Sequence, residues 1–258
     1  MITRSDFPDV QWPPLNLGYN ASIAALVAQL QQTERMPIED IHFEQNKQLA
    51  ILVKHHILNT ASFAERIKNA NLISSKIDRD WLKKLPTINK EYIQQCGSGF
   101  SCLNVPKQHL PVGEAKTSGS TGQPVTVARS AITQVIWEAM TVRDHQWNKR
   151  NYNSRLCAIR ANIEKETVQP NWGATVNRLY KSGPSLGMNI SSNIDHMMKR
   201  LREFQPNILV IHAGALLEMI DVWNKNGFDL HDLKHIKRDK SESRKQGNVD
   251  RLYWHSDF

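Results

Sequence analysis

Eight consecutive residues, Thr117 to Pro124, carry residue types that are well suited to binding phosphate. They run Thr-Ser-Gly-Ser-Thr-Gly-Gln-Pro, with hydroxyl side chains and glycines but no aliphatic side chain. Backbone N–H groups and short hydroxyl donors can close around a polyanion such as a nucleotide triphosphate. Ser/Thr/Gly clusters are also typical of flexible linkers. The order and context of the residues must therefore decide between the two interpretations.

The spacing of the glycines excludes three common motifs. No lysine follows either glycine of the segment, as a Walker-type P-loop requires. The nearest candidate for a dinucleotide fingerprint, Gly97 to Gly99, has Cys102 where the third glycine belongs. A nucleophile elbow needs glycine two residues before its serine, and Ser118 holds that place before Ser120.

The order of the segment, followed by the β-branched run Val125 to Val127, resembles the phosphate-binding signature of adenylate-forming enzymes. This superfamily includes acyl-CoA synthetases and related acid-activating ligases. Many members have lysine directly after the proline, and Val125 at that position is more similar to the phenylacetate-CoA ligase branch. The segment Leu85 to Ile93 also resembles that branch's Leu-Pro-x-x-x-Lys-x-x-Leu/Ile motif. The likeness extends over residues ~40 to ~236 and is sharp only at these two places.

The resemblance implies a reaction and a set of ligands. A carboxylate attacks the α-phosphate of ATP, pyrophosphate leaves, and the acyl-adenylate passes its acyl group to a thiol such as that of CoA, with Mg²⁺ accompanying the nucleotide. The loop binds the β- and γ-phosphates through hydroxyls, through amides and through a cation near its base. These groups belong to Ser118, Ser120 and Thr121, to Gly119 and Gly122, and to Lys116, while Thr117 orients the base.

Other parts of the family's machinery find no match in this sequence. The resemblance leads us to expect an aromatic-Gly-x-Thr-Glu motif, a ribose-binding Asp and a Lys in a small C-terminal domain, and none is present up to Phe258. We identify no catalytic residue. We therefore expect only the N-terminal part of such an enzyme, truncated and inactive alone, with a C-terminal fragment as its partner.

Composition is that of a water-soluble, cytoplasmic protein. The chain has 258 residues and a mean hydropathy of -0.50. Its most apolar stretch, residues 207–223, contains His212, Glu218 and Asp221, and no apolar signal-peptide core follows the N-terminus. The cysteines show no C-x-x-C spacing, which argues against a disulfide framework and a zinc site. We expect no membrane partner and no protein-bound metal.

The net charge of +8 can attract anionic ligands. Lys and Arg are spread along the chain among acidic residues, and no block resembles a known nucleic-acid-binding motif. A nucleotide and a small carboxylic acid are therefore the favoured partners over nucleic acid. A non-catalytic nucleotide-binding or interaction protein is the main alternative, and a nucleic-acid-binding protein is the third interpretation.

Hydrophobic periodicity predicts an α/β protein with an at least partly parallel sheet. Helices are expected at 20–30, 45–70 and 215–223, and further helices after an N-cap at Ser130 and a capping box at 192–195. Strands are expected at 125–128, 156–159 and 207–211. Adjacent His55 and His56 on the second helix point in different directions and make poor metal partners.

These elements predict three regions. Residues 1–110 form a mainly helical region that begins with an extended segment over residues 1–19, and 111–236 form an incomplete α/β nucleotide-binding core of the large N-terminal domain. Residues 237–258 form a basic, disordered tail. A shifted reading frame or a truncated gene would produce such an abrupt change, and a genuine short basic tail is the alternative.

Overall fold

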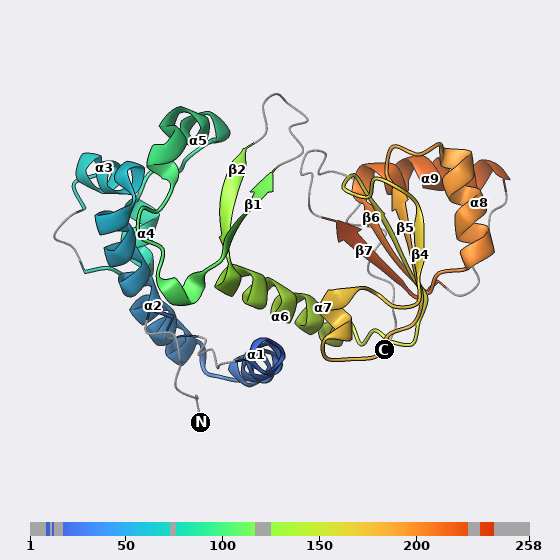
Figure 1. Cartoon of the computed structure of the whole chain (residues 1–258), viewed down its shortest axis with the longest axis horizontal. Coiled ribbons are helices and arrows are strands. Elements are labelled where there is room, and N and C mark those ends of the chain that lie inside the picture. Colours follow the sequence, from blue (N-terminus) through green and yellow to red (C-terminus); the bar gives the residue numbers. More distant parts are fainter. Residues whose placement is uncertain are drawn as a thin grey trace. The chain divides into compact units, whose positions relative to one another are not determined.

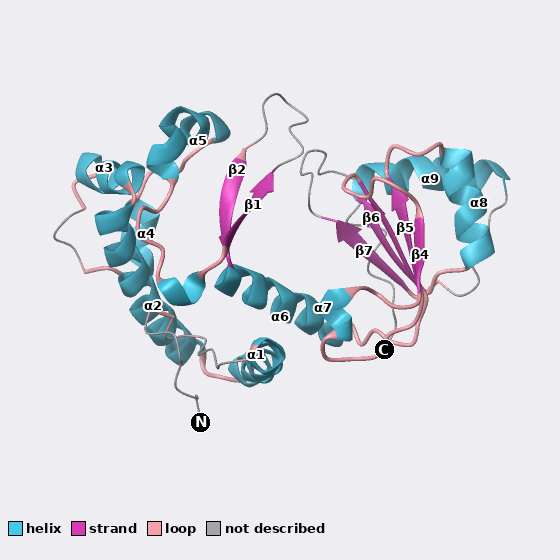
Figure 2. Cartoon of the chain, viewed as in Figure 1, coloured by secondary structure: helices cyan, strands magenta, loops and turns pink. Residues whose placement is uncertain are grey.

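The chain folds into two compact units, Met1–Asp144 and His145–Phe258 (Figure 1). The computed structural model describes residues 9, 10, 12, 18–72, 76–116, 125–226 and 233–239. Helices dominate the first unit, and the second contains a five-stranded sheet with helices (Figure 2). The predicted α/β class is confirmed. No helix in the described part of the chain is long and apolar enough to cross a membrane.

In its described residues, the first unit begins with five α-helices and two short 3-10 helices. They are α1 (Tyr19–Thr33), α2 (Ile38–Asn59), α3 (Ala61–Asn69), α4 (Arg79–Lys84), α5 (Lys90–Cys96), η1 (Gly97–Phe100) and η2 (Lys107–His109). Most of the predicted N-terminal extended segment lies outside the described residues. The backbones of Asp9 and Trp12 each bond to the side chain of Gln48 on α2.

A small core around Trp81 joins the helices α2, α3 and α4. Trp81 is buried with Val53, Ile67 and Leu72. Its indole nitrogen donates to the Leu72 carbonyl over 3.2 Å, so the polar end of the ring is satisfied inside the core. Asp78 caps α4 by accepting from the Trp81 amide.

The single helix predicted for residues 45–70 is wrong, because Thr60 divides it into α2 and α3. Thr60 has an extended backbone with φ −136° and ψ 106°. It is buried, and its hydroxyl lies 2.9 Å from Nδ1 of His56. A β-branched residue adopts this extended backbone readily, and apolar periodicity continues across the break, which is why the pattern did not reveal it.

A hairpin and a long helix complete the first unit. Strands β1 (Val112–Lys116) and β2 (Thr126–Ser130) pair antiparallel, and α6 (Ala131–Trp147) follows at once. The predicted Ser130 cap is confirmed, since its hydroxyl accepts from the Thr133 amide. Side-chain bonds connect α1 and its C-cap to α6: Tyr19 donates to the buried Glu138, and Arg143 donates to Glu34.

The sheet of the second unit has the strand order β4-β5-β3-β6-β7. Its strands are β3 (Leu156–Arg160), β4 (Thr167–Gln169), β5 (Ser185–Asn189), β6 (Ile208–His212) and β7 (His235–Asp239). All neighbours are parallel except β4 and β5. The helices are α7 (Ala174–Asn177), α8 (Ile194–Phe204) and α9 (Ala213–Asn226). The predicted partly parallel sheet is confirmed.

Helices α8 and α9 pack on one face of this sheet. Leu201 of α8 and Met219 of α9 share a buried core with Cys157, Ile159 and other inward residues of β3, β5 and β6. Both crossovers, β5-α8-β6 and β6-α9-β7, move in one direction across the sheet, and right-handed connections then place both helices on the same face. The connection from β3 to β5 runs the other way, and its Trp172 packs against the opposite face.

Two local expectations for the second unit need correction. The N-cap of α8 is Asn193, whose side chain accepts from the amides of Asp195 and His196, and not Ser192. Strand β7 continues through Asp239, so residues 237–239 of the predicted disordered tail pair with β6. The predicted boundary after residue 110 stays a prediction; the contacts divide the chain after Asp144.

Candidate functional site

The hairpin β1–β2 is the frame of the predicted phosphate loop, residues 117–124. Its register pairs Val112 with Ser130 and Lys116 with Thr126. Paired residues of antiparallel strands lie about 4.5–5.5 Å apart at Cα. The hairpin therefore holds the two ends of the loop side by side, and the predicted strand at 125–128 with a helix after Ser130 is confirmed by β2 and α6.

The phosphate-binding residues themselves fall outside the described residues. This applies to Thr117, Ser118, Gly119, Ser120, Thr121 and Gly122. Lys116 is the last residue of β1, and only its backbone pairing is described. Their assignment to phosphate binding stays a prediction that the hairpin accommodates.

The exit of the loop is anchored at one residue and exposed at the next. Val125 is 7% exposed, whereas β2 is exposed from Thr126 to Arg129. A buried valine fixes where the chain enters β2. The exposed strand beyond it leaves this side of the hairpin accessible to a ligand.

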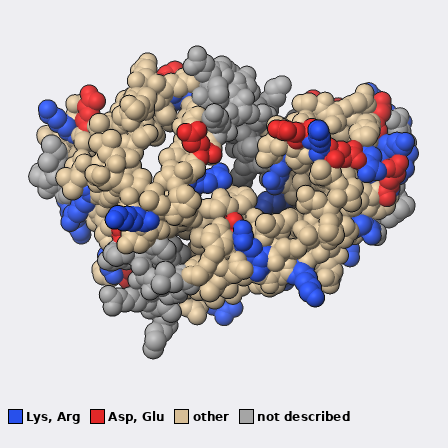
Figure 3. All heavy atoms as spheres, in the orientation of Figure 1, with Lys and Arg blue, Asp and Glu red and all other residues tan. Residues whose placement is uncertain are grey.

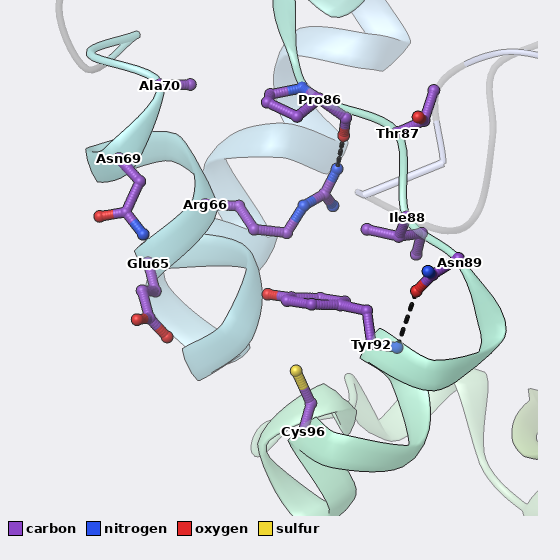
Figure 4. Close-up of a pocket in the computed structure, with 10 residues that line it drawn as sticks. All are labelled: Glu65, Arg66, Asn69, Ala70, Pro86, Thr87, Ile88, Asn89, Tyr92 and Cys96. Carbon is purple, nitrogen blue, oxygen red and sulfur yellow. Dashed lines mark hydrogen bonds between the residues drawn. The ribbon is translucent and has the colours of Figure 1, made fainter.

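The second family-like segment, Leu85 to Ile93, forms the start of α5 and one wall of an open pocket of about 540 Å³ (Figure 4). Asn89 caps α5, and its Oδ1 accepts from the Tyr92 amide over 2.9 Å. On the opposite wall, the Arg66 guanidinium of α3 donates to the Pro86 carbonyl. These two bonds hold the segment against α3.

Arg66 also lies over the ring of Tyr92, 5.9 Å from its centroid. Burial, together with a hydrogen bond to Cys96, raises the pKa of Tyr92 above its ordinary value. The phenol is therefore neutral at physiological pH, and its oxygen donates to the Ser62 carbonyl over 3.4 Å. Arg66 and Tyr92 thus position this segment, and neither makes contacts suited to proton transfer.

In the second unit, the carboxyl ends of the parallel strands bring polar residues to one edge of the sheet. Arg160 ends β3, Asn189 ends β5 and His212 ends β6. Chain connections leave the neighbouring strands β3 and β6 in opposite directions, which makes their carboxyl ends a topological switch point. Ligands of open α/β sheets commonly bind at such a point, so Arg160 and His212 are candidate ligand-binding residues.

Two of these edge residues also organise the adjoining turns. Asn189 donates to the Ile163 carbonyl and accepts from the Ser191 amide, each over 2.7 Å. His212 Nδ1 accepts from the Gly214 amide over 3.2 Å. Sequence reasoning missed this set. Polar residues directly after the predicted strands 156–159 and 207–211 were the available signal for Arg160 and His212.

Among the described residues, no group of three or more His, Cys, Asp or Glu side chains could hold a metal ion. The neighbours His55 and His56 contact different partners: the Cys102 sulfur lies 3.2 Å from His55, and the Thr60 hydroxyl lies 2.9 Å from His56. The described cysteines are free thiols.

Charged side chains are mixed on the face drawn in Figure 3. Lys and Arg are interspersed with Asp and Glu on the coloured part of this surface. Nucleic-acid-binding surfaces typically gather basic residues on one face or along one helix. This face therefore shows no feature that favours nucleic acid over a small anionic ligand.

No family model and no curated protein matches the chain. Solved structures of 2-hydroxyisobutyryl-CoA ligase, an adenylate-forming enzyme, do match. The complex with 2-HIB-AMP and CoA in the thioesterification state matches with a TM-score of 0.53 and 13% identity, over 78% of this chain and 43% of that one. An open conformation with the same ligands matches with a TM-score of 0.48 and 13% identity, over 90% of this chain and 52% of that one.

The chain thus spans about half, or less, of the length of these ligases. At this sequence identity the likeness concerns the fold. The described residues are therefore similar in fold to part of 2-hydroxyisobutyryl-CoA ligase, and they form the predicted α/β fold with a helical N-terminal region.

Proposed function

We propose that this chain carries the ATP-phosphate-binding part of an adenylate-forming acid-CoA ligase similar to the phenylacetate-CoA ligase branch. The observation that carries the proposal is the Thr117–Pro124 signature held between the paired ends of β1 and β2. The fold likeness to 2-hydroxyisobutyryl-CoA ligase supports it. The substrate would be a small carboxylic acid, activated with ATP and transferred to CoA.

In this mechanism the chain orients the leaving pyrophosphate. Hydroxyls of Ser118, Ser120 and Thr121 and the amides of the two loop glycines donate to the β- and γ-phosphates, while Lys116 supplies positive charge near the loop's base. Donors fixed where negative charge develops stabilise the transition state without reorganising. The hairpin contributes by fixing both ends of the loop, so fewer conformations are lost on binding.

Mg²⁺ enters the proposal with the nucleotide. This ion usually keeps several waters and binds through substrate phosphates and one or two carboxylates. When bound, it would neutralise phosphate charge.

The test is nucleotide binding by a loop variant. We expect Ser120→Ala combined with Thr121→Ala to weaken ATP and pyrophosphate binding about tenfold or more, since each hydroxyl lost removes a hydrogen bond to a charged group. AMP binding should not change. The matched control is Ser98→Ala with Ser101→Ala, which removes two hydroxyls from the η1 region. Equal ATP affinity in the loop variant and the control would refute the proposal.

The chemical step needs a separate assay. The assay follows the exchange of labelled pyrophosphate into ATP in the presence of an added acid, such as 2-hydroxyisobutyrate or phenylacetate. Exchange that requires the acid and that is lost in the loop variant supports adenylation. ATP binding without acid-dependent exchange supports instead the non-catalytic nucleotide-binding protein.

A further inference from the structure

A second site of different chemistry lies in the first unit, where a thiol, an imidazole and an amide meet beside a cavity. The Cys102 sulfur lies 3.2 Å from His55 Nε2. On the other side of the ring, Asn59 Nδ2 lies 3.4 Å from His55 Nδ1. A nucleophile paired with a ring that a third group orients is the arrangement found in thiol catalysis.

The orientation of the Asn59 amide decides where the imidazole carries its hydrogen. Its Oδ1 accepts from Asn104 over 2.8 Å, and its Nδ2 donates to the His55 carbonyl over 2.7 Å. Nδ2 therefore faces Nδ1, so Nδ1 is the acceptor and the neutral ring has its hydrogen on Nε2, directed at the sulfur. A hydrogen bond from Nε2 stabilises the thiolate, which is the nucleophilic form of cysteine.

A cavity of about 350 Å³ borders this cluster; we call it the thiol pocket. Cys102, His55 and His56 line it together with side chains from α2, the hairpin and the start of α6. Its apolar lining includes Ile51, Leu52, Val105, Pro106 and Ile132. This volume is at the small end of ligand pockets, and its aliphatic wall suits a short acyl chain.

We propose that Cys102 is an acyl-accepting nucleophile that reacts with short acyl thioesters. The thiolate attacks the thioester carbonyl, a carbon–sulfur bond to Cys102 forms, and the bond to the donor thiol breaks. The proton that the Cys102 thiol gave up is taken by the departing thiolate, so the exchange needs no oxidant or reductant. The net charge of +8 favours donors with a phosphate-bearing carrier such as CoA. The proposal does not depend on ATP binding.

The other cysteines provide internal standards. Burial is the main cause that raises the pKa of the Cys157 thiol, which makes Cys157 unreactive. Cys96 is partly exposed at a different pocket, beside Tyr92. On incubation of the full chain with butyryl-CoA at neutral pH, peptide mass spectrometry should show Cys102 acylated at least about tenfold faster than Cys96. Hydroxylamine should reverse the modification.

Variants of His55 separate a hydrogen-bond donor from a space-filling side chain. His55→Gln keeps an N–H near the position of Nε2, so Cys102 should be acylated at most of its original rate. His55→Leu keeps comparable volume without the donor and should lower the rate about tenfold or more, because a hydrogen bond to a charged group contributes roughly that factor. His42→Leu is the matched control, since His42 lies on the same helix α2 but is not among the residues that line the thiol pocket, and it should leave the rate of Cys102 acylation unchanged.

Two results would overturn the proposal. One is equal acylation of Cys96 and Cys102 in the unchanged protein, a comparison that decides the matter even if a variant does not fold. The other is a folded His55→Leu variant that acylates Cys102 as fast as the unchanged protein.

Discussion

The phenol of Tyr152 lies stacked on Tyr180, with ring centroids 4.6 Å apart. Burial, followed by the neighbouring Tyr180, raises the pKa of Tyr152 to about 12 from a usual 10.0. Because the folded pKa lies above the unfolded one, this contribution to stability is present below pH 10 and is lost as pH rises toward 12. Between these values the folded state holds a proton that the unfolded state releases.

We therefore expect Tyr152→Phe to remove part of the alkaline loss of stability. The Tyr152 hydroxyl is buried and has no hydrogen-bond partner among the described residues, so Phe should cost nothing at neutral pH. Chemical unfolding of both proteins from neutral pH to pH 12 measures this difference. A stability difference that stays constant above pH 10 would contradict the assignment.

Glu166 gives a prediction at acid pH. Burial alone would raise its pKa, but hydrogen bonds from His196 and Arg200 outweigh burial and hold the pKa below the usual 4.5. The contribution of Glu166 to stability is therefore present above pH 4.5 and is lost as the pH falls through the pKa of Glu166 in the folded protein. The group is partly exposed, so Glu166→Gln should cost at most about 1 kcal/mol at neutral pH.

The difference in the free energy of unfolding between Glu166→Gln and the unchanged protein should shrink as the solution is acidified. Denaturant unfolding at several pH values measures it. The matched control is Glu164→Gln, an exposed carboxylate two residues away, which should have little effect at any pH. If both variants behave alike, the ion pairs of Glu166 contribute nothing.

From the order of residues 117–124, sequence reasoning predicted a phosphate loop, which stays a prediction. It did not reach the Cys102–His55 contact, because the two residues are far apart in the chain and belong to elements whose packing no periodicity encodes. It named Ser192 as a cap, although Asn193 performs that role, because Ser, Asn and Asp are all good caps and stand together there.

The turn before β5 requires a glycine at position 183. The Gly183 amide donates to the Tyr152 carbonyl over 2.7 Å, which ties β5 to the turn that precedes β3. A Cβ at Gly183 would lie 2.5 Å from the carbonyl oxygens of Asn153 and Ser154. Those atoms are backbone and can move little.

Gly183→Ala should therefore destabilise the second unit by about 1–3 kcal/mol, the usual cost of overpacking. Thermal unfolding followed by circular dichroism measures this. Gly99→Ala is the control, because a Cβ there meets nothing within 4 Å, and its effect should be within about 0.5 kcal/mol. A Gly183→Ala variant as stable as the control would show that the turn relaxes easily.

The elements that sequence reasoning found are those with continuous apolar character. Strand β6 is buried along Ile208–Ile211 and α8 has a strong apolar face, so both were predictable. Strand β5 alternates the buried Leu186 and Met188 with less buried residues over only five positions, which is a short signal, and β4 is exposed throughout. β5 takes its place in the sheet by pairing with β3, and β4 takes its place by pairing with β5. Such pairing depends on contacts between distant segments, which the pattern within one segment does not encode.

For the whole molecule, the fold class was predictable because alternating helices and strands favour a parallel sheet. The division into two units was not, since α6 runs continuously across the boundary at Asp144. Each unit nevertheless has its own buried core. Val53, Ile67, Leu72 and Trp81 form one, and the inward residues of β3, β5 and β6 with α8 and α9 form another.

Separate cores predict separate local stabilities. Leu201 is completely buried in the second unit and Leu26 in the first. Replacing either by Ala removes most of a buried side chain and should cost about 2–5 kcal/mol. Hydrogen exchange read by mass spectrometry should show Leu201→Ala lowering protection in residues 145–226 and Leu26→Ala lowering it in 18–144. Each variant is the control for the other, and equal loss of protection in both units from either change would mean that the chain unfolds as one cooperative body.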